Sequence, residues 1–198
     1  MARIGDAGEL GDWAAYRARM DQLLSGLTGS VLEIGAGRGA NFARLPAGVA
    51  WTGLEPDPKS CAALARAAAG NGRPSRVLRG VAERIPLADD SVDAVVETVV
   101  LCSVGDQNRV VQEIRRVLKP GGAFVFVEHV AAPPGTWTRA AQRAYAPMSR
   151  KLVGGCDPAL ETWRAIEGAG FARVDYTWFR SRWPLPLTTL RVVGQARA

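Results

Sequence analysis

The chain has 198 residues, 47% of them hydrophobic and 22% charged, a composition that fits one globular domain with a substantial core. No stretch approaches the roughly 18 apolar residues of a membrane-spanning helix, and no signal-peptide pattern opens the sequence. The formal net charge is +6, but the arginines are spread along the chain, which predicts a scattered basic surface rather than a nucleic-acid track.

Cysteine usage bears on compartment and metal content. Cys61, Cys102 and Cys156 are the three cysteines of the chain. Their spacing matches no metal-binding motif, and an odd number cannot all pair within one chain. We therefore expect reduced thiols in a cytoplasmic protein, and no metal site.

The first predicted element is a helix that Asp12 can cap. Its apolar residues recur at the spacing of one helical face, over Trp13, Tyr16, Met20, Leu23, Leu24 and Leu27. Because this helix precedes the first strand, it must pack on the flank of a sheet or lie over a crevice. Tyr16 is a candidate either for the core or for a contact with a bound ligand.

An apolar strand over residues 31–34 leads into three alternating glycines, Gly35, Gly37 and Gly39. Glycine reaches positive φ and has no Cβ, so this loop can turn tightly and let a ligand contact the backbone. A helix is expected just after it, and the free N–H groups at its start favour an anionic group. Glu55, twenty residues after Gly35, ends the next apolar run and can bind two ribose hydroxyls. The pattern predicts a nucleoside-cofactor site.

Two cofactor classes fit this loop. Gly35, Gly37 and Ala40 satisfy the dinucleotide pattern G-x-G-x-x-A, which leaves an NAD-type site open. The alternating glycines and the acid two residues before them fit a second pattern. Glu33-x-Gly35-x-Gly37-x-Gly39 resembles the first motif of class I S-adenosylmethionine (SAM) methyltransferases.

This resemblance implies SAM as the cofactor and assigns roles around the loop. Glu33 would steady the glycine loop and the methionine ammonium group, Glu55 would hold the ribose, and the helix within residues 1–28 would act as a lid. Many members carry an aspartate near the end of the third strand for the adenine amino group. Val81 takes that place here, so the backbone just after it or the Glu83 side chain would substitute. The full predicted cofactor-binding set is Tyr16, Glu33, Gly35, Ala36, Gly37, Asn41, Glu55, Pro56, Ala82, Glu83, Thr98 and Val99.

Strands and helices alternate after the loop. The predicted elements are a short helix over 41–45, a strand over 49–55, a helix over 61–69 capped by Asp57, strands over 75–80 and 92–96, a helix from Asp106 to Leu118, and a strand over 123–128. Before the last of these, Leu-Lys-Pro-Gly-Gly is a turn that recurs widely in class I methyltransferases. Thr98 to Cys102 leave the fourth strand at its carboxyl end, where open α/β sheets place ligands. This segment lacks the Asn/Asp-Pro-Pro-Tyr element of DNA amino-methyltransferases, which disfavours base methylation.

The last third of the chain is less regular in sequence. It predicts an irregular segment over 133–155, a helix that starts at Asp157-Pro158 and closes near 168–170, and strands over 173–180 and 189–196 joined by 181–187. Alternating strands and helices followed by a hairpin predict a single α/β domain over residues 1–198. Its core would be a doubly wound, Rossmann-like, mostly parallel seven-stranded sheet with an antiparallel terminal hairpin.

Several stretches between Leu32 and Phe171 recur together in one branch of the methyltransferases. They are Gly39-Ala40-Asn41-Phe42, Glu55-Pro56, Val100-Leu101-Cys102-Ser103-Val104, Arg116-Val117-Leu118, Pro120-Gly121-Gly122-Ala123-Phe124, Glu128-His129-Val130-Ala131, Trp137, Gln142, Pro147, Gly155-Cys156 and Thr162-Trp163. Through them the chain is similar to the animal methyltransferase-like proteins that act as thiol S-methyltransferases. It departs from them in three ways. We expect no membrane anchor ahead of the domain, Met148-Ser149 replaces a tryptophan after the proline, and the terminal hairpin matches poorly.

This closer resemblance implies a small-molecule thiol as the methyl acceptor. A thiol needs little activation, because a pKa near ~8.5 already leaves a few per cent of thiolate at neutral pH. His129, the only histidine, follows the fifth strand and is the candidate catalytic residue. It would accept a proton or orient the acceptor, or else be a hydrogen-bonded histidine at a strand end. The predicted pocket residues are Cys102, Ser103, Trp137 and Cys156.

Other functions stay open on the sequence alone. They are O- or N-methylation of another small metabolite, an NAD-dependent oxidoreductase, and a non-catalytic SAM-binding module. The oxidoreductase is disfavoured because the chain has no second, substrate-binding domain. We expect a small-molecule partner and no nucleic-acid partner, and the sequence predicts no oligomeric state.

Overall fold

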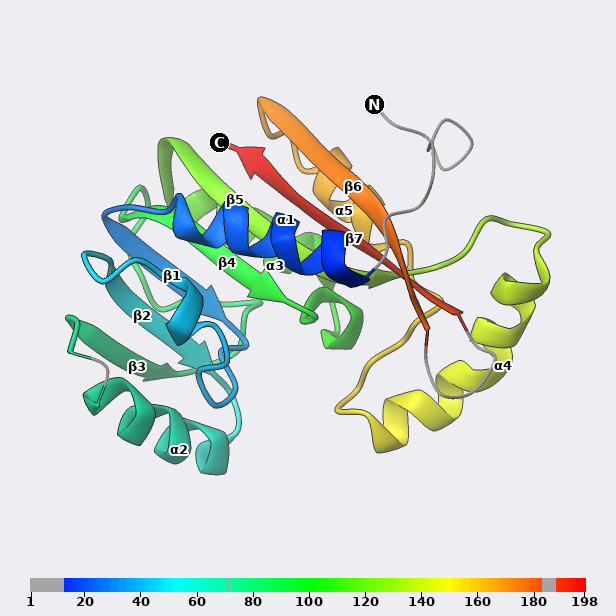
Figure 1. Cartoon of the computed structure of the whole chain (residues 1–198), viewed down its shortest axis with the longest axis horizontal. Coiled ribbons are helices and arrows are strands. Elements are labelled where there is room, and N and C mark those ends of the chain that lie inside the picture. Colours follow the sequence, from blue (N-terminus) through cyan, green and yellow to red (C-terminus); the bar gives the residue numbers. More distant parts are fainter. Residues whose placement is uncertain (1–12, 71, 183–187) are drawn as a thin grey trace.

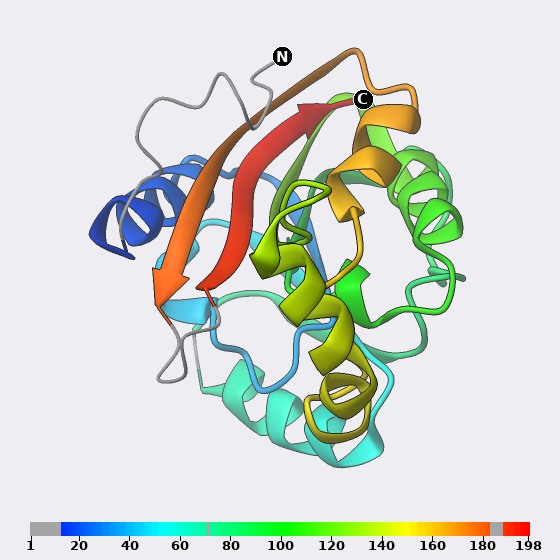
Figure 2. The ribbon, with the colours of Figure 1, turned by 90° about the vertical axis from the view of Figure 1, so that its right-hand side faces the viewer.

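A computed structural model describes residues 13–70, 72–182 and 188–198, which form a seven-stranded sheet with helices on both faces (Figures 1 and 2). The strands are β1 (Ser30–Ile34), β2 (Ala50–Glu55), β3 (Ser75–Arg79), β4 (Val92–Thr98), β5 (Leu118–Val130), β6 (Arg173–Arg182) and β7 (Thr188–Arg197). The helices are α1 (Trp13–Ser25), α2 (Pro58–Ala69), α3 (Gln107–Val117), α4 (Trp137–Leu152) and α5 (Thr162–Gly168). Two short 3-10 turns are η1 (Phe42–Arg44) and η2 (Leu101–Ser103).

The strand order is β3-β2-β1-β4-β5-β7-β6. Strands β1 to β5 are parallel, and β7 runs antiparallel between β5 and β6. The predicted doubly wound sheet with an antiparallel terminal hairpin is therefore confirmed. The chain builds outward from β1 to β3 and then returns to β4 on the other side of β1, so a crevice opens at the carboxyl ends of β1 and β4.

Two apolar layers enclose the sheet. One layer contains Leu24 of α1 and Leu64 of α2, packed with Trp51, and the other contains Ile114 of α3 and Ile166 of α5. Figure 2 shows α1 on one side of β6 and β7, with α3 and α5 on the other side. The central strands β1 and β4 are almost wholly buried, because helices cover both faces of the sheet.

The predicted helix starts at Asp57 and Asp106 are confirmed. The Asp57 carboxylate accepts the backbone N–H of Ser60 at 2.7 Å, and the Asp106 carboxylate accepts that of Arg109 at 3.0 Å. Each bond satisfies an N–H group that has no partner within its own helix. Both helices begin at the carboxyl end of the sheet, so these caps fix the rim of the crevice.

The prediction of an irregular segment over 133–155 was wrong, because this segment contains the 16-residue helix α4. Thr136 caps it, with its hydroxyl accepting the N–H of Arg139 at 3.2 Å. Pro147 lies inside the helix, where proline removes a hydrogen-bond donor, and this argued against a helix in the sequence. Figure 1 shows α4 beyond the carboxyl ends of the parallel strands, at one end of the molecule.

A buried amide, rather than an apolar stripe, attaches α4 to the sheet. The Gln142 side chain accepts the N–H of Ala132 at 2.7 Å and donates to the carbonyl of Val130 at 3.1 Å. These bonds satisfy the backbone of the chain where it leaves β5. A polar residue on the buried face weakens the 3.6-residue apolar period by which a helix is recognised.

Two further boundaries differ from the prediction. Strand β5 begins at Leu118, so Leu-Lys-Pro-Gly-Gly is part of the strand, with a register shift opposite Val92 and Ala94, rather than a turn before it. Helix α5 begins at Thr162 rather than at Asp157, whose carboxylate instead accepts the N–H of Ala159 at 2.9 Å. The predicted cap Asp12 and the hairpin connection over 183–187 lie outside the described residues.

Within the described ranges, no helix combines the length and the apolar character needed to cross a membrane.

Candidate active site

The glycine loop after β1 turns through positive φ at Gly35, Gly37 and Gly39, with φ of +58°, +55° and +85°. A Cβ added at Gly35 would meet the Val100 side chain, and one at Gly39 would meet that of Phe42. At Gly37 the nearest atom to such a Cβ is the carbonyl oxygen of Gly35, at 4.0 Å. The backbone is therefore packed on either side of Gly37 and open at Gly37, which is where a ligand can approach it.

Glu55, at the end of β2, ties the glycine loop to the start of α2. Its carboxylate accepts the N–H of Gly37 at 2.9 Å and the N–H of Asp57 at 3.0 Å, one on each oxygen. Each carboxylate oxygen has two acceptor sites, so one site on each oxygen is left for a ligand hydroxyl. This is the geometry that a ribose-binding acid requires.

Glu33 lies fully buried in β1, two residues before the glycine loop, and holds that loop through hydrogen bonds. Its carboxylate accepts the side-chain amide of Asn41 at 2.7 Å and the indole N–H of Trp51 at 2.9 Å. Asn41 also reaches the hydroxyl of Thr98 at 3.3 Å, which connects the loop to β4. Burial raises the pKa of Glu33 to about 7, although both of these hydrogen bonds act to lower it. In this structure Glu33 positions the loop, and its contact with a methionine ammonium group stays a prediction.

A cavity of about 350 Å³ opens beside this loop at the carboxyl ends of β1, β2 and β4. Its lining residues are Gly35, Leu54, Glu55, Pro56, Gly80, Val81, Ala82, Glu83, Val99, Val100, Ser103, Val104, Gly105 and Gly154. The cavity thus brings together half of the predicted cofactor set from four separate segments of the chain. Glu83 accepts the N–H of Gly105 at 3.1 Å, so its carboxylate already has one partner at the rim.

Val99 holds a strained backbone conformation at this cavity. Its φ is +62°, in the left-handed region, and its N–H donates to the carbonyl of Val127 at 2.7 Å. A β-branched residue rarely adopts such a φ, and the conformation costs on the order of 1–3 kcal/mol. Strained residues of this kind gather at functional sites, and Val99 lies where the predicted cofactor and acceptor regions meet.

Two buried carboxylates, which the sequence analysis did not identify as site residues, shape the turn η2. Glu97 of β4 accepts the N–H of Val100 at 2.6 Å, while Glu128 of β5 accepts those of Leu101 at 2.6 Å and Cys102 at 3.2 Å. Burial, followed by the neighbouring Glu128 carboxylate, raises the pKa of Glu97 well above its usual value. The raised pKa favours the protonated form of Glu97, which can then donate a hydrogen bond to the Glu128 carboxylate. The sequence signal was an acid within each of two otherwise apolar strands.

The turn η2 brings Cys102 against Cys156 and His129. The two sulfur atoms are 3.2 Å apart, and the Cys156 sulfur is 3.5 Å from Nδ1 of His129. Both cysteines are buried and His129 is half-buried. Hydrogen bonds from Cys102 and His129 lower the pKa of Cys156 to about 5, whereas the bond to Cys156, together with burial, raises the pKa of Cys102. These bonds favour the thiolate form of Cys156, with the Cys102 thiol and the His129 imidazole as its partners.

These three side chains bear on one expectation from the sequence. Because the cysteines lack metal spacing in the chain, no metal site was expected, yet the fold gathers Cys102, His129 and Cys156 with their ligand atoms within 4.8 Å of one another. Of the other predicted pocket residues, Ser103 lines the cavity, and its hydroxyl lies 3.6 Å from the Cys102 sulfur. Trp137 begins α4 with 85% of its surface exposed and lies outside the cavity lining, so its place in the pocket stays a prediction.

Tyr16 lies in the packed layer rather than in the cavity lining. Its ring stacks on Trp13 at 4.6 Å and meets the edge of Phe179 at 5.9 Å. Its hydroxyl accepts a hydrogen bond from the Arg191 guanidinium at 3.3 Å. Tyr16 was predicted either to pack in the core or to contact a ligand. The structure places it in the core, and a ligand contact stays a prediction.

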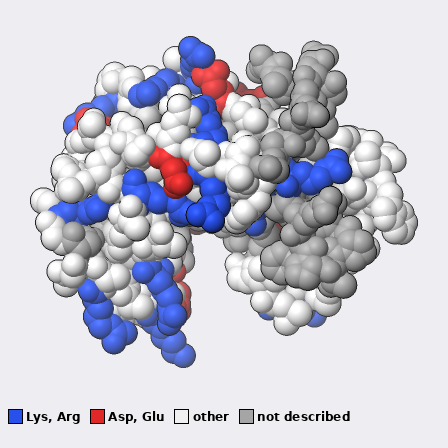
Figure 3. Space-filling model, in the orientation of Figure 1, with Lys and Arg blue, Asp and Glu red and all other residues white. Residues whose placement is uncertain are grey.

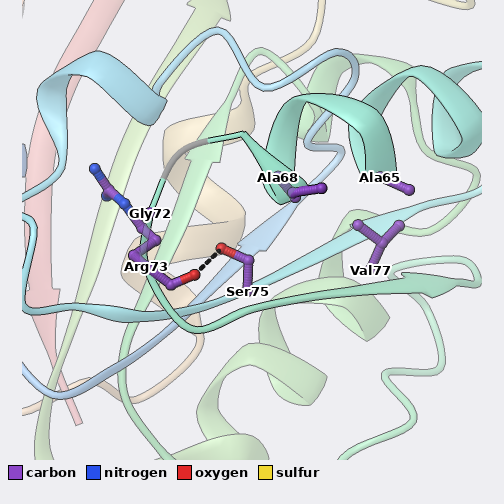
Figure 4. Close-up of a pocket in the computed structure, with 7 residues that line it drawn as sticks. Ala65, Ala68, Gly72, Arg73, Ser75 and Val77 are labelled. Atoms are coloured by element: carbon purple, nitrogen blue, oxygen red, sulfur yellow. Dashed lines mark hydrogen bonds between the residues drawn. The ribbon is translucent and has the colours of Figure 1, made fainter.

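A second cavity, of about 380 Å³, lies between α2 and β3 (Figure 4). Small side chains such as Ala65, Ala68 and Val77 line it, and the Ser75 hydroxyl donates to the carbonyl of Arg73 at 3.1 Å. Its lining includes no carboxylate, cysteine or histidine.

Comparison with known proteins identifies the family. Residues 32–126 match the family described as methyltransferase domain. Human thiol S-methyltransferase TMT1B is 40% identical over 177 residues, which cover 85% of this chain and 71% of that protein. The chain belongs to the SAM-dependent methyltransferases. Human thiol S-methyltransferase TMT1A is 42% identical to this methyltransferase over 148 residues, or 73% of the chain, and the match spans 61% of TMT1A.

Solved structures share the methyltransferase fold at low sequence identity. The YcgJ protein of Bacillus subtilis superposes with a TM-score of 0.71 at 16% identity, covering 91% of this chain and 98% of that one. A putative methyltransferase from Bacillus halodurans gives 0.73 at 17% identity, covering 91% and 97%. At these identities the likeness shows the fold alone.

SAM is the methyl donor of this family, and the crevice of this methyltransferase fits it. Gly37 leaves its backbone open, the Glu55 carboxylate keeps acceptor sites free, and the cavity beside them extends to Val99 and Ser103. A nucleoside with a charged sulfonium arm requires such a set of groups: a ribose acceptor, an uncrowded backbone and a largely apolar wall.

Proposed function

We propose that this methyltransferase transfers the methyl group of SAM to the sulfur of a small-molecule thiol. The observation that carries the proposal is the 40% identity to human TMT1B, a thiol S-methyltransferase by name, over 85% of this chain. The match includes the segments that carry His129 and both buried cysteines, and these segments form the acceptor side of the site.

On the donor side, Glu55 binds the ribose hydroxyls and Gly37 lets the cofactor approach the backbone. Ala82 and Glu83 line the cavity where the adenine is expected. Val81 also lines it, and about half of its surface is exposed. When bound, SAM supplies a methyl group activated by an adjacent sulfonium. The remaining predicted contacts are those of Glu33, Gly35, Ala36, Asn41, Pro56, Thr98, Val99 and, from the α1 layer, Tyr16.

On the acceptor side, methyl transfer is an in-line displacement that requires alignment and exclusion of water. Ser103 and Gly154 line the cavity, and each is one or two residues from a buried cysteine, so the sulfur cluster lies directly behind this wall. The wall is apolar apart from Ser103, which suits a thiol that arrives as the thiolate. His129 accepts the thiol proton or orients the acceptor.

The test of this function is an assay with SAM and a panel of small thiols. We expect one S-methyl thioether to form for each S-adenosylhomocysteine released, with a rate that rises with pH as thiolate forms. SAM binding without any S-adenosylhomocysteine would instead indicate a non-catalytic binding module. Tight binding of NADH would overturn the assignment as a whole.

We also propose that the partner is a small molecule rather than a nucleic acid. Figure 3 shows Lys and Arg at several separate places on one face, with uncharged surface between them. Several arginines are also engaged in ion pairs, such as Arg44 with Asp21 and Arg150 with Asp157. A gel shift with duplex DNA or RNA should give only weak binding that is lost by physiological salt. A complex that survives competitor nucleic acid at that salt would contradict this.

A further inference from the structure

The cluster of Cys102, Cys156 and His129 has a chemistry that methyl transfer itself does not require. Direct transfer from SAM needs no covalent intermediate on the protein and no second cysteine. Yet two sulfur atoms and one imidazole nitrogen lie within 4.8 Å of one another, contributed by η2, the end of β5 and the segment after α4. We propose that these three side chains form a binding site for a soft divalent cation, of which Zn²⁺ is the representative.

The distances match the coordination shell of such an ion. Zinc binds cysteine sulfur at about 2.3 Å and histidine nitrogen at about 2.0–2.1 Å in tetrahedral geometry. Tetrahedral angles then place two sulfur ligands about 3.8 Å apart, and a sulfur and a nitrogen about 3.5 Å apart. The cluster has 3.2 Å between the two sulfurs and 3.5 Å between the Cys156 sulfur and the His129 nitrogen. Coordination therefore requires the two sulfurs to move apart by about 0.6 Å. The Cys102 sulfur and the His129 nitrogen, which lie within 4.8 Å of each other, must approach by up to about 1.3 Å.

The backbone already holds the three ligand segments together. Glu128, the residue before His129, accepts the N–H of Cys102 at 3.2 Å. The carbonyl of Cys102 in turn accepts the N–H of Asp157, the residue after Cys156, at 2.8 Å. Thr162 donates from its hydroxyl to the carbonyl of His129 at 3.3 Å. A site locked in this way needs little reordering when an ion binds, which is what outer-shell bonds provide in known metal sites.

The ligand set also selects the kind of ion. Thiolate and imidazole ligands suit zinc and other soft or borderline cations, whereas Mg²⁺ and Ca²⁺ require oxygen ligands. Two thiolates and a neutral imidazole carry a charge of −2, so a divalent cation makes the buried cluster neutral. Binding releases the thiol protons to solvent.

Three protein ligands leave the fourth tetrahedral position open, as in catalytic rather than structural zinc sites. A thiol acceptor is a suitable fourth ligand, and this second step rests on the proposed function. The coordinated thiol loses its proton to solvent. Its sulfur forms a bond to the methyl carbon as the bond from that carbon to the sulfonium breaks, giving the thioether and S-adenosylhomocysteine. With the ion bound, His129 is a ligand, and its role as proton acceptor under the proposed function belongs to the metal-free protein.

Titration of the reduced, chelator-stripped protein with Co²⁺ tests the site without any substrate. We expect one equivalent of Co²⁺ to bind with sulfur-to-metal charge-transfer absorption and the visible bands of a tetrahedral site, and we expect Zn²⁺ to displace it. These bands should disappear in Cys102→Ser/Cys156→Ser and should be retained in the matched control Cys61→Ser. Bands that persist in the double variant, or that are absent from the wild type, would overturn the proposal.

X-ray absorption of the Zn²⁺-loaded wild type keeps the test independent of variant folding. Two sulfur ligands and at least one imidazole nitrogen are expected, whereas a shell of oxygen and nitrogen alone would overturn the site. Adding a small thiol to the Co²⁺ protein should then strengthen the charge-transfer absorption. If the stripped protein methylates thiols but binds no Co²⁺ at the cluster, the metal site fails and the proposed function stands. If Co²⁺ binds but no thiol is methylated with or without Zn²⁺, the proposed function fails and the metal site stands.

Discussion

The donor and acceptor sides of this site are built in different ways. The donor side is a local unit, in which β1, the glycine loop and β2 follow one another and the bonds from Gly37 to Glu55 and from Trp51 to Glu33 each span 18 residues. The acceptor side joins distant segments, since Leu101 bonds to Glu128 across 27 residues and Cys102 meets Cys156 across 54. The donor side therefore depends mostly on contacts between neighbouring segments of the chain, whereas the acceptor side exists only when β4, β5 and the segment after α4 are all in place.

The chemistry of the two sides differs as well. The donor side offers open backbone and a carboxylate with free acceptor sites, which suit a polar cofactor of fixed structure. The acceptor side offers buried sulfur and one imidazole, held by carboxylates that do not face the cavity. Substitutions on the donor side should therefore act on cofactor affinity. Substitutions behind the acceptor side should act on stability, on the chemical step, or on both.

The largest expected effect is on the acceptor chemistry. His129→Gln keeps a hydrogen-bonding side chain of similar length but cannot accept a proton near neutral pH, so the rate of thiol methylation should fall by roughly 10²–10⁴-fold. Higher pH should partly restore the rate, because more thiolate then forms without help. Steady-state kinetics against pH measures this, with Cys61→Ser as the control. Full activity at neutral pH would remove His129 from the mechanism and leave the thiol assignment standing.

The buried pair behind η2 should dominate stability. Glu128→Ala leaves the N–H groups of Leu101 and Cys102 without an acceptor and removes the carboxyl group beside Glu97, at a cost of about 3–5 kcal/mol in the free energy of unfolding. Glu97→Gln is the matched control, since its amide can donate to Glu128 and accept from the N–H of Val100 as the protonated acid does. It should change stability by less than about 1 kcal/mol. Equal losses for the two variants in urea unfolding would mean that Glu97 is not the protonated partner.

The loop anchor Glu33 should give the fold a pH dependence below neutrality. Burial raises its pKa from 4.5 to about 7, so the folded state binds this proton more tightly than the unfolded state does. The resulting stabilisation is complete below pH 4.5, decreases as pH rises towards 7, and is absent above it. The total is about 3 kcal/mol at 1.36 kcal/mol per pKa unit. Between pH 4.5 and 7, the free energy of unfolding of the wild type should fall relative to that of Glu33→Gln. If the two free energies run parallel across this pH range, the assignment to Glu33 is contradicted.

Cofactor affinity should show the smallest of these effects. Glu55→Ala should weaken SAM binding by about 1.5–3 kcal/mol, the usual scale for hydrogen bonds to a charged group. Asp89→Ala removes an exposed carboxylate paired with Arg116, away from the cavity lining, and should leave the affinity unchanged. Calorimetric titration with SAM measures both variants. An unchanged affinity for Glu55→Ala would separate Glu55 from the ribose.

The local character of the donor side explains why the sequence predicted it well. Glu33, the alternating glycines and Glu55 lie at spacings that a strand, a tight turn and a second strand impose, so their meeting could be derived from distances along the chain. The capped helix starts at Asp57 and Asp106 were predictable for the same reason. What the sequence did not reveal was that the Glu33 carboxylate already accepts hydrogen bonds from Asn41 and Trp51, because the orientation of the Trp51 side chain depends on packing.

The acceptor side was predicted only as a set of separate residues. His129, Cys102, Ser103 and Cys156 were candidates from the resemblance, but no spacing rule relates residues that β4, β5 and the segment after α4 bring together. Helix α4 was missed for two reasons. Pro147 argues against a helix, and the buried Gln142 interrupts the 3.6-residue repeat of apolar residues. The carboxylate pair was missed because an acid in an apolar strand is usually exposed, whereas here each acid satisfies backbone N–H groups of η2.

The central claim, transfer of a methyl group to a thiol, is tested most directly by competition among acceptors that differ in one atom. Thiophenol, phenol and aniline share the same ring, so equal concentrations in one reaction with SAM compare sulfur, oxygen and nitrogen in the same shape. We expect the S-methyl product to dominate and to match the S-adenosylhomocysteine released one for one. Methylation of phenol or aniline faster than of every thiol tested would contradict the account.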